Sequence, residues 1–343
     1  MGKGQTKIGG GRMSAIVIAG WIVGSALALV AIAAALTMRP DIPREQVVRA
    51  YSMPDSRFLT LKDGSVAHVR ISGSGPPLVL LPGFSSSTFA WDGWARTLAD
   101  RYQLIRIDAP GHGLTAMAAN ADLSPSGGTA FLIEIIDALG LDAVAIAGNS
   151  MGGGQAWRLA ALHPDRVTAL ILVDSAGPTS RRVDGDIARV RRAAANPLLR
   201  TALLYGGGEL VMAQALKSGV HDPKTISPDD VRRTDQLYRA AGNRAVLLRS
   251  LEARASDPVA ARPADIRAPT LIMQGAEDRL VPPDVARALA ADIPGARLII
   301  YPGLGHTPHQ EAPEKTAGDA GAFLDAVLGD KPGERRYMDG SHR

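Results

Sequence analysis

The segment Gly148-Asn149-Ser150-Met151-Gly152 decides how this chain folds, because of the residues on either side of it. Before it, residues 143–147 read Ala-Val-Ala-Ile-Ala, which is typical of a strand that is buried on both faces of a parallel sheet. After it, residues 155–162 have the pattern of a helix. The sequence therefore predicts a sharp strand-to-helix turn with Ser150 at its apex. The two flanking glycines remove side chains that would collide there, and the helix N-terminus favours a developing negative charge.

A serine hydroxyl is a weak nucleophile that needs a base, and the base needs a third group to orient it. For a serine on this kind of turn, the expected order along the chain is serine, acid, histidine. Residues 269–275 predict a strand that is followed by Asp278, and residues 296–301 predict a strand that is followed by His306. Open parallel sheets place ligands at the carboxyl ends of their strands. We therefore predict Ser150, Asp278 and His306 as nucleophile, acid and base.

Four other residues compete for these roles with weaker support. Glu277 adjoins the predicted acid, and His309 follows the predicted base by three positions, where we expect a cavity wall or a surface histidine. His112 precedes the serine, which is the wrong chain order for this turn. Asp174 ends a predicted strand at residues 170–173 and is a reserve candidate for the acid.

The order and spacing of five segments resemble α/β-hydrolase-fold serine hydrolases over roughly residues 60–328. These segments are Leu78 to Phe84, Asp108 to Gly113, Gly148 to Gly153, Gly275 to Asp278 and Gly305-His306. The resemblance implies an α/β fold with a mostly parallel, doubly wound sheet and a helical cap inserted into it. Related subfamilies use an aspartate as nucleophile, and the serine at position 150 argues against their activities.

Two backbone N–H groups must bind the oxyanion that forms during acyl transfer. Met151, directly after the nucleophile, offers the first, and the resemblance places the second at Phe84. The family usually has His-Gly before that position, whereas this chain has Pro82-Gly83. Proline has no N–H, but the Phe84 N–H is unaffected. We therefore expect the oxyanion hole to be formed by Phe84 and Met151.

The N-terminal part of the chain contains 25 consecutive uncharged residues, from Met13 to Thr37. As a helix with a rise of ~1.5 Å per residue, this run exceeds the ~30 Å hydrocarbon core of a bilayer. Lys3, Lys7 and Arg12 precede the run, which predicts a single-pass membrane anchor with a cytoplasmic N-terminus and a periplasmic or extracellular catalytic domain. A cleaved signal peptide is the alternative, with 33–35 as the cleavage site.

The chain divides into seven predicted parts. These are a cytoplasmic tail (1–12), the anchor (13–37), a polar linker (38–57), a first core part (58–177), a helical cap (178–262), a second core part (263–329) and a flexible tail (330–343). Residues 58–72 predict a hairpin that turns at Asp63-Gly64. The cap has 15 Lys and Arg against 9 Asp and Glu, which indicates either solvated helix faces or contact with an anionic membrane or acidic substrate.

Composition limits the chemistry further. The 343 residues include no cysteine, which excludes disulfides and a cysteine nucleophile. No Cys/His cluster indicates a metal, and no glycine-rich phosphate loop indicates a nucleotide, so we expect neither a metal nor a cofactor. The net charge of +4 is spread along the chain and gives no reason to expect nucleic acid.

These features predict a cofactor-free serine hydrolase that cleaves a small-molecule carboxylic ester through an acyl-enzyme intermediate. The segment Gly-Asn-Ser-Met-Gly-Gly at 148–153 also resembles carbon–carbon bond hydrolases of aromatic ring-cleavage pathways. Those enzymes typically carry a longer glycine-rich oxyanion loop, whereas this chain has Ser85-Ser86-Ser87-Thr88. A non-catalytic binding protein on the same fold is a remote alternative, which the intact Ser150, Asp278 and His306 oppose.

Overall fold

The computed structural model describes residues 38–178, 192–206, 208–253 and 260–329, together with Trp21 and Ser25. The predicted anchor at 13–37 therefore lies outside the described residues except at those two positions, as do both predicted tails and part of the predicted cap. Within the described part of the chain, no helix combines the length and the apolar character that crossing a membrane requires.

The centre of the molecule is an eight-stranded sheet with the order β1-β2-β4-β3-β5-β6-β7-β8. The pairs β1–β2 and β2–β4 are antiparallel and all the others are parallel. The predicted hairpin at residues 58–72 is thus the β1–β2 pair, and the mostly parallel α/β sheet is confirmed. The strands are β1 (Ser56–Thr60), β2 (Val66–Ser72), β3 (Pro77–Leu81), β4 (Gln103–Ile107), β5 (Val144–Asn149), β6 (Val167–Val173), β7 (Thr270–Gly275) and β8 (Arg297–Tyr301).

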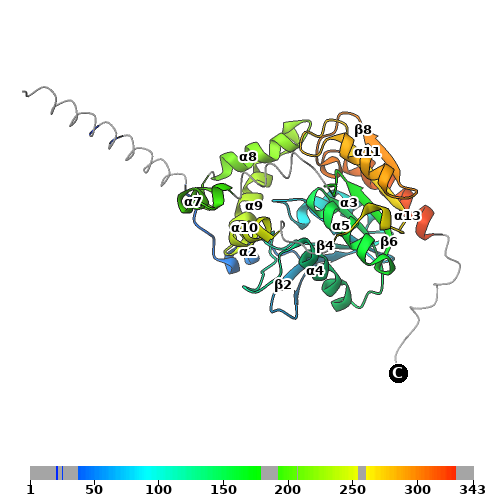
Figure 1. The fold of residues 1–343 in the computed structure, drawn as a ribbon, viewed down its shortest axis with the longest axis horizontal. Helices are drawn as coiled ribbons and strands as arrows, with labels where there is room; N and C mark the ends of the chain where they lie inside the picture. The colour runs from blue at the N-terminus through cyan, green and yellow to red at the C-terminus, as the bar shows by residue number, and fades with distance from the viewer. Residues whose placement is uncertain are drawn as a thin grey trace, which may run out of the picture.

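Helices cover both faces of this sheet (Figure 1). The first core contains buried residues of α4 and α5, such as Phe131 and Trp157, and of α11. The second contains buried residues of α3 and α13, such as Trp94 and Phe323. The described helices are α2 (Arg44–Tyr51), α3 (Asp92–Leu98), α4 (Pro125–Ala138), α5 (Met151–Leu162), α7 (Pro197–Tyr205), α8 (Gly208–Gly219), α9 (Pro228–Tyr238), α10 (Asn243–Ala253), α11 (Pro283–Asp292), α12 (Pro308–Glu311) and α13 (Pro313–Leu328).

Strand β5 shows why the sequence forms a central strand. Successive side chains of a strand point to opposite faces. Val144 and Ile146 accordingly belong to the first core, and Ala145 and Ala147 belong to the second. All six residues of β5 are buried, as expected for a strand between two helical layers. This buried strand gives the turn at Ser150 a rigid support.

The connection from β6 to β7 contains the helices α7, α8, α9 and α10, which lie together beyond one edge of the core (Figure 1). Part of the predicted linker at 38–57 is also helical, which the sequence analysis did not predict. Its helix α2 packs the buried Val47 against Leu114, Leu237 and Ala240. Arg44 Nη2 donates to the Ala241 carbonyl at 2.8 Å. A segment that is predicted to be a polar linker is therefore fixed against the cap.

Candidate active site

Ser150 occupies the turn between β5 and α5, and its backbone has φ 52° and ψ −116°. A positive φ is strained for a non-glycine residue, and such strain concentrates at functional sites. The flanking glycines are sterically required. A Cβ on Gly148 would lie 2.4 Å from the backbone of Gly152, and one on Gly152 would lie 2.5 Å from the Leu81 carbonyl oxygen. The local sequence thus produces the sharp turn that presents Ser150.

Asp278 and His306 meet at the carboxyl ends of β7 and β8. His306 Nδ1 lies 2.7 Å from Asp278 Oδ2, and both side chains are buried. The other oxygen, Oδ1, accepts the N–H groups of Leu280 at 2.7 Å and Val281 at 3.0 Å. Burial opposes the charge on Asp278, but the hydrogen bonds and the His306 charge together hold the pKa of Asp278 below its ordinary value. Asp278 is therefore ionised at neutral pH and accepts the Nδ1–H of His306.

The serine and the histidine are brought to the same edge of the sheet through Asn149. Its Nδ2 donates to the carbonyl oxygens of His306 at 3.0 Å and of Val173 at 3.1 Å. Among the described residues, the Ser150 hydroxyl itself makes no hydrogen bond to His306. Catalytic hydrogen bonds are often long in a free enzyme and shorten when substrate binds.

Asp174 lies beside Asp278 at the end of β6 and does not replace it. Its Oδ1 accepts hydrogen bonds from Gln274 Nε2 at 2.7 Å and from the Gly275 N–H at 3.0 Å. Burial and, after it, the Asp278 carboxylate raise the pKa of Asp174 well above its ordinary value. The raised pKa favours the protonated form of Asp174, which lies next to the Asp278 carboxylate that is paired with His306.

Gln274 connects the two acids, and the sequence analysis did not identify it. Its Nε2 is 2.7 Å from Asp174 Oδ1 and 3.4 Å from Asp278 Oδ2. Gln274 is the penultimate residue of β7 and so lies at the carboxyl end of the strand. That position could have indicated a polar residue of the site. Asp278, and not the exposed Glu277, is the carboxylate that pairs with His306.

Asp174, Asp278 and His306 lie close enough together to be considered as metal ligands. One ligand atom of each lies within 4.8 Å of the others. The raised pKa of Asp174 favours its protonated form, however, and both oxygens of Asp278 already accept hydrogen bonds. A metal ligand must be deprotonated and must have a free lone pair. This donor set suits a hydrogen-bonded acid–base relay better than a metal centre.

The predicted oxyanion donors Phe84 and Met151 lie in two segments that approach each other at Ser150. Met151 is the first residue of α5, and Phe84 lies in the loop that follows β3. Among the described residues, neither N–H donates to another backbone group outside a helix or strand. The Pro82-Gly83 step brings this loop against the turn, because a Cβ on Gly83 would lie 3.3 Å from Ser150 Cβ. Ser85, with φ 56°, continues the loop in a second strained conformation.

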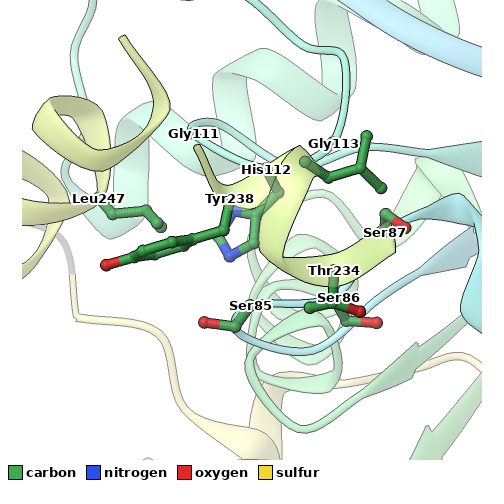
Figure 2. A pocket seen from close by; sticks show the side chains of 10 residues that line it. Ser85, Ser86, Ser87, Gly111, His112, Gly113, Thr234, Tyr238 and Leu247 are labelled. Carbon is green, nitrogen blue, oxygen red and sulfur yellow. The ribbon is translucent and has the colours of Figure 1, made fainter. Parts of the chain in front are cut away.

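A pocket of about 10 Å³, which fits roughly one water molecule, separates this loop from cap helix α9. Figure 2 shows His112 pointing into the pocket near Tyr238 and Ser85. His112 Nδ1 is 2.9 Å from the Pro110 carbonyl oxygen, so Nδ1 carries the hydrogen and Nε2 is an acceptor. Burial lowers the pKa of His112 and keeps the ring neutral. His112 therefore supports the loop after β3. Its ring packs edge-on against that of Phe84, and the two ring centroids lie 5.7 Å apart.

His309 is buried, so the surface role that the sequence allowed is wrong. Its ring lies 4.3 Å from that of Trp91, measured between centroids. Neither ring nitrogen has a hydrogen-bond partner among the described residues. Burial, with a smaller contribution from the charge of His306, lowers the pKa of His309 to about 3. His309 is therefore a neutral wall residue behind the His306 loop.

This burial predicts that His309 makes the fold sensitive to acid. Between pH 6.5 and pH 3 the unfolded chain binds a proton at this histidine and the folded chain does not, so stability falls as the pH falls. We expect His309→Leu to reduce the loss of unfolding free energy between pH 7 and pH 5 by about 1–2 kcal/mol. Urea unfolding at both pH values measures this difference. An equal loss in the wild type and the variant would contradict the assignment.

A second serine, histidine and aspartate are linked elsewhere in the molecule. His68 Nε2 lies 2.8 Å from Ser56 Oγ, and His68 Nδ1 lies 2.7 Å from Asp108 Oδ2. Ser56 begins the edge strand β1, and it is not among the residues with positive φ. The Ser56 site therefore lacks the strained turn and the helix N-terminus that Ser150 has.

The role of this second cluster is structural. Asp108 also accepts the N–H groups of Thr88 at 2.8 Å and Leu114 at 2.9 Å. It thereby joins the loop after β4, the segment after β3 that contains Thr88, and the β1–β2 hairpin. The segment 108–113 therefore has an architectural role.

The cap contacts the predicted base directly. The His306 N–H donates to the Gly219 carbonyl at the end of α8, with a distance of 2.6 Å. Glu311 links the cap to the loop before His306, because it accepts the N–H groups of His221 at 2.7 Å and of Gly305 at 2.9 Å. A Cβ on Gly305 would come within 2.7 Å of the Gly219 oxygen, which explains the glycine before the histidine. The position of His306 therefore depends on the cap as well as on the sheet.

Comparisons with known proteins agree with this architecture. The family model described as the alpha/beta hydrolase fold matches residues 76–313. An uncharacterised protein of Mycobacterium tuberculosis is 28% identical over 293 residues, which cover 82% of this chain and 84% of that protein. The pimeloyl-[acyl-carrier protein] methyl ester esterase of Nitrosomonas europaea is 35% identical over 117 residues, covering 34% and 44% of the two chains.

A third relative is named for a different activity. The 2-hydroxymuconate semialdehyde hydrolase of a Pseudomonas species is 34% identical over 109 residues, covering 31% of this chain and 38% of that one. These two shorter matches cover less than half of each enzyme, so they do not transfer a substrate. The family match spans more than two thirds of the chain and agrees with the sheet order and the turn at Ser150. The chain belongs to the alpha/beta hydrolase fold family.

Proposed function

We propose that this protein is a serine hydrolase that cleaves carboxylic esters through a Ser150–His306–Asp278 triad. The observation that carries the proposal is the hydrogen-bonded Asp278–His306 pair at the same sheet edge as the strained Ser150 turn. Strain at a nucleophile and a base oriented by a buried carboxylate are the features that serine acyl transfer requires.

The first half of the reaction forms an acyl-enzyme. Ser150 Oγ attacks the carbonyl carbon of the ester, and its proton moves to Nε2 of His306. Since the Nδ1–H of His306 is donated to Asp278, Nε2 is free to accept that proton. The N–H groups of Phe84 and Met151 stabilise the oxyanion of the tetrahedral intermediate. The carbon–oxygen bond then breaks, and His306 protonates the leaving alcohol.

The second half regenerates the enzyme. A water molecule gives a proton to His306 and attacks the acyl carbon, and the oxyanion again accepts hydrogen bonds from Phe84 and Met151. Collapse of this intermediate releases the carboxylic acid, and the proton returns from His306 to Ser150. In this scheme Asp174 is a positioning residue, because it holds Gln274, whose Nε2 also lies 3.4 Å from Asp278 Oδ2.

Carbon–carbon bond hydrolysis is the second candidate. The Gly-Asn-Ser-Met-Gly-Gly segment at 148–153 and the partial similarity to a 2-hydroxymuconate semialdehyde hydrolase support it. The two activities are separated by assaying p-nitrophenyl butyrate and 2-hydroxymuconate semialdehyde with the same preparation. We expect turnover of the ester with a higher kcat/KM. Turnover of the semialdehyde alone would replace ester hydrolysis with the second candidate.

We further propose that residues 13–37 anchor the protein in a membrane, with the N-terminus in the cytoplasm and the hydrolase on the opposite side. The absence of charge over 25 residues and the preceding Lys3, Lys7 and Arg12 support this arrangement. We expect the full-length protein in the membrane fraction after a carbonate wash, with its N-terminal residues retained. A soluble product that begins near residue 36 would favour the cleaved signal peptide.

A further inference from the structure

Two helices of the cap leave apolar side chains without a partner. Helix α8 buries none of its residues, although it carries Leu210 and Val211, which are 81% and 56% exposed. On the neighbouring α7, Leu199 is 51% exposed. These are three of the nine large apolar side chains that are exposed among the described residues. Leu210 and Val211 are adjacent in α8, and adjacent exposed apolar side chains mark an interaction site more often than isolated ones do.

The chain that follows the predicted anchor is fixed beside these helices. The Arg39 N–H donates to the carbonyl oxygen of Tyr205, the last residue of α7, at 2.8 Å. Arg244 links this segment to the same end of α7. Its Nη2 donates to the Arg39 carbonyl at 2.8 Å, and its Nη1 donates to the Leu204 carbonyl at 2.7 Å. Asp41 accepts from Arg244 Nε at 2.8 Å. Residue 39 therefore has a defined place at the junction of α7 and α8.

Chain length limits how far this junction lies from the apolar run. The run ends at Thr37, and two residues span at most about 7 Å. If residues 13–37 cross a bilayer, the end of α7 is held within roughly one helix diameter of the membrane surface. Figure 1 shows the blue segment that begins at residue 38 beside α7.

We propose that α7 and α8 form a membrane-docking surface, with Leu199, Leu210 and Val211 inserted among the lipid headgroups. This inference rests on the proposed membrane anchor. An amphipathic helix that lies in the interface gains free energy from its buried apolar face and from basic residues near anionic lipid. Lys217 in the last turn of α8 supplies positive charge. Arg200 in α7 is paired with Glu252 at 3.9 Å, and Glu209 in the first turn of α8 adds a negative charge.

The docking surface is connected to the predicted base. Helix α8 ends at Gly219, whose carbonyl oxygen accepts the N–H of His306 at 2.6 Å. One helix therefore extends from the proposed membrane contact to the catalytic edge of the sheet. This arrangement suits a substrate that resides in the membrane, such as an ester with a long acyl chain.

The absence of cysteine from the chain permits a direct test. Leu199→Cys, Leu210→Cys and Phe58→Cys each create one site for an environment-sensitive fluorophore in the full-length protein. Phe58 is a matched control, since it is 42% exposed and lies on the edge strand β1. Each labelled protein is reconstituted into anionic vesicles with and without a lipid that carries a nitroxide quencher. Co-flotation with the vesicles is recorded for every sample.

We expect a blue shift and a loss of more than about half of the fluorescence at positions 199 and 210, and little change at position 58. Equal quenching at all three positions in protein that floats with the vesicles would overturn the docking surface and leave the anchor intact. Protein that does not float would refute the anchor and the surface together. Self-quenching between labelled copies without lipid quenching would instead indicate an interface between two copies of the chain.

Discussion

Replacing Ser150 by alanine is expected to lower kcat for p-nitrophenyl butyrate by about 10⁴-fold or more, because no other group can form the acyl-enzyme. The substitution removes one oxygen from a residue whose backbone is held by the Val173 carbonyl, which accepts the Ser150 N–H at 3.0 Å. The fold should therefore be unchanged. Steady-state kinetics, with the melting temperature measured on the same sample, check both statements.

The chain supplies its own control for this experiment. Ser56 also lies 2.8 Å from a histidine that is paired with an aspartate, but it has no strained turn and no adjacent helix N-terminus. Ser56→Ala should leave kcat unchanged within about twofold and lower the melting temperature slightly. Activity that survives Ser150→Ala and is lost in Ser56→Ala would reverse the assignment of the nucleophile.

Replacing Asp278 by asparagine is expected to lower kcat by roughly 10³- to 10⁴-fold, because the amide no longer fixes the imidazole tautomer or stabilises the imidazolium. The neighbouring Asp174→Asn is the matched control. The raised pKa of Asp174 favours its uncharged form, and an asparagine replaces that form without a change of charge. We therefore expect Asp174→Asn to retain kcat within about threefold.

Profiles of kcat against pH separate the roles of the two acids. Because the raised pKa of Asp174 favours its protonated form, Asp174→Asn should leave the acidic limb of the profile in place. A loss of activity in Asp174→Asn that matches the loss in Asp278→Asn would contradict the account. It would mean that Asp174 acts as a charged member of the triad.

The fold and much of the site could be predicted from the sequence because they depend on local patterns. The turn at Ser150 is determined by Gly148 and Gly152, each of which would place a Cβ within 2.5 Å of backbone atoms. The pairing of Asp278 with His306 follows because the loops after β7 and β8 are adjacent once those strands pair. The mostly parallel sheet and the strands that precede the site residues are thus accessible from the sequence.

Contacts between segments distant in the sequence were not accessible in this way. Helix α2 reads as a polar linker because only Val47 of its residues is buried, and its packing partners lie in the cap. Burial and then Asp278 raise the pKa of Asp174. Asp278 is more than a hundred residues away and becomes a neighbour only in the folded sheet. The burial of His309 likewise depends on Trp91, which lies in a different part of the chain.

The most direct test of the central proposal is labelling of the full-length protein with a fluorophosphonate probe, followed by mass mapping of the modified peptide. An activated serine reacts with this probe, and an ordinary surface serine does not. The account predicts one adduct, on Ser150, which is absent from the Ser150→Ala variant. No adduct in folded protein, or an adduct on Ser56, would contradict the assignment of Ser150 as the nucleophile.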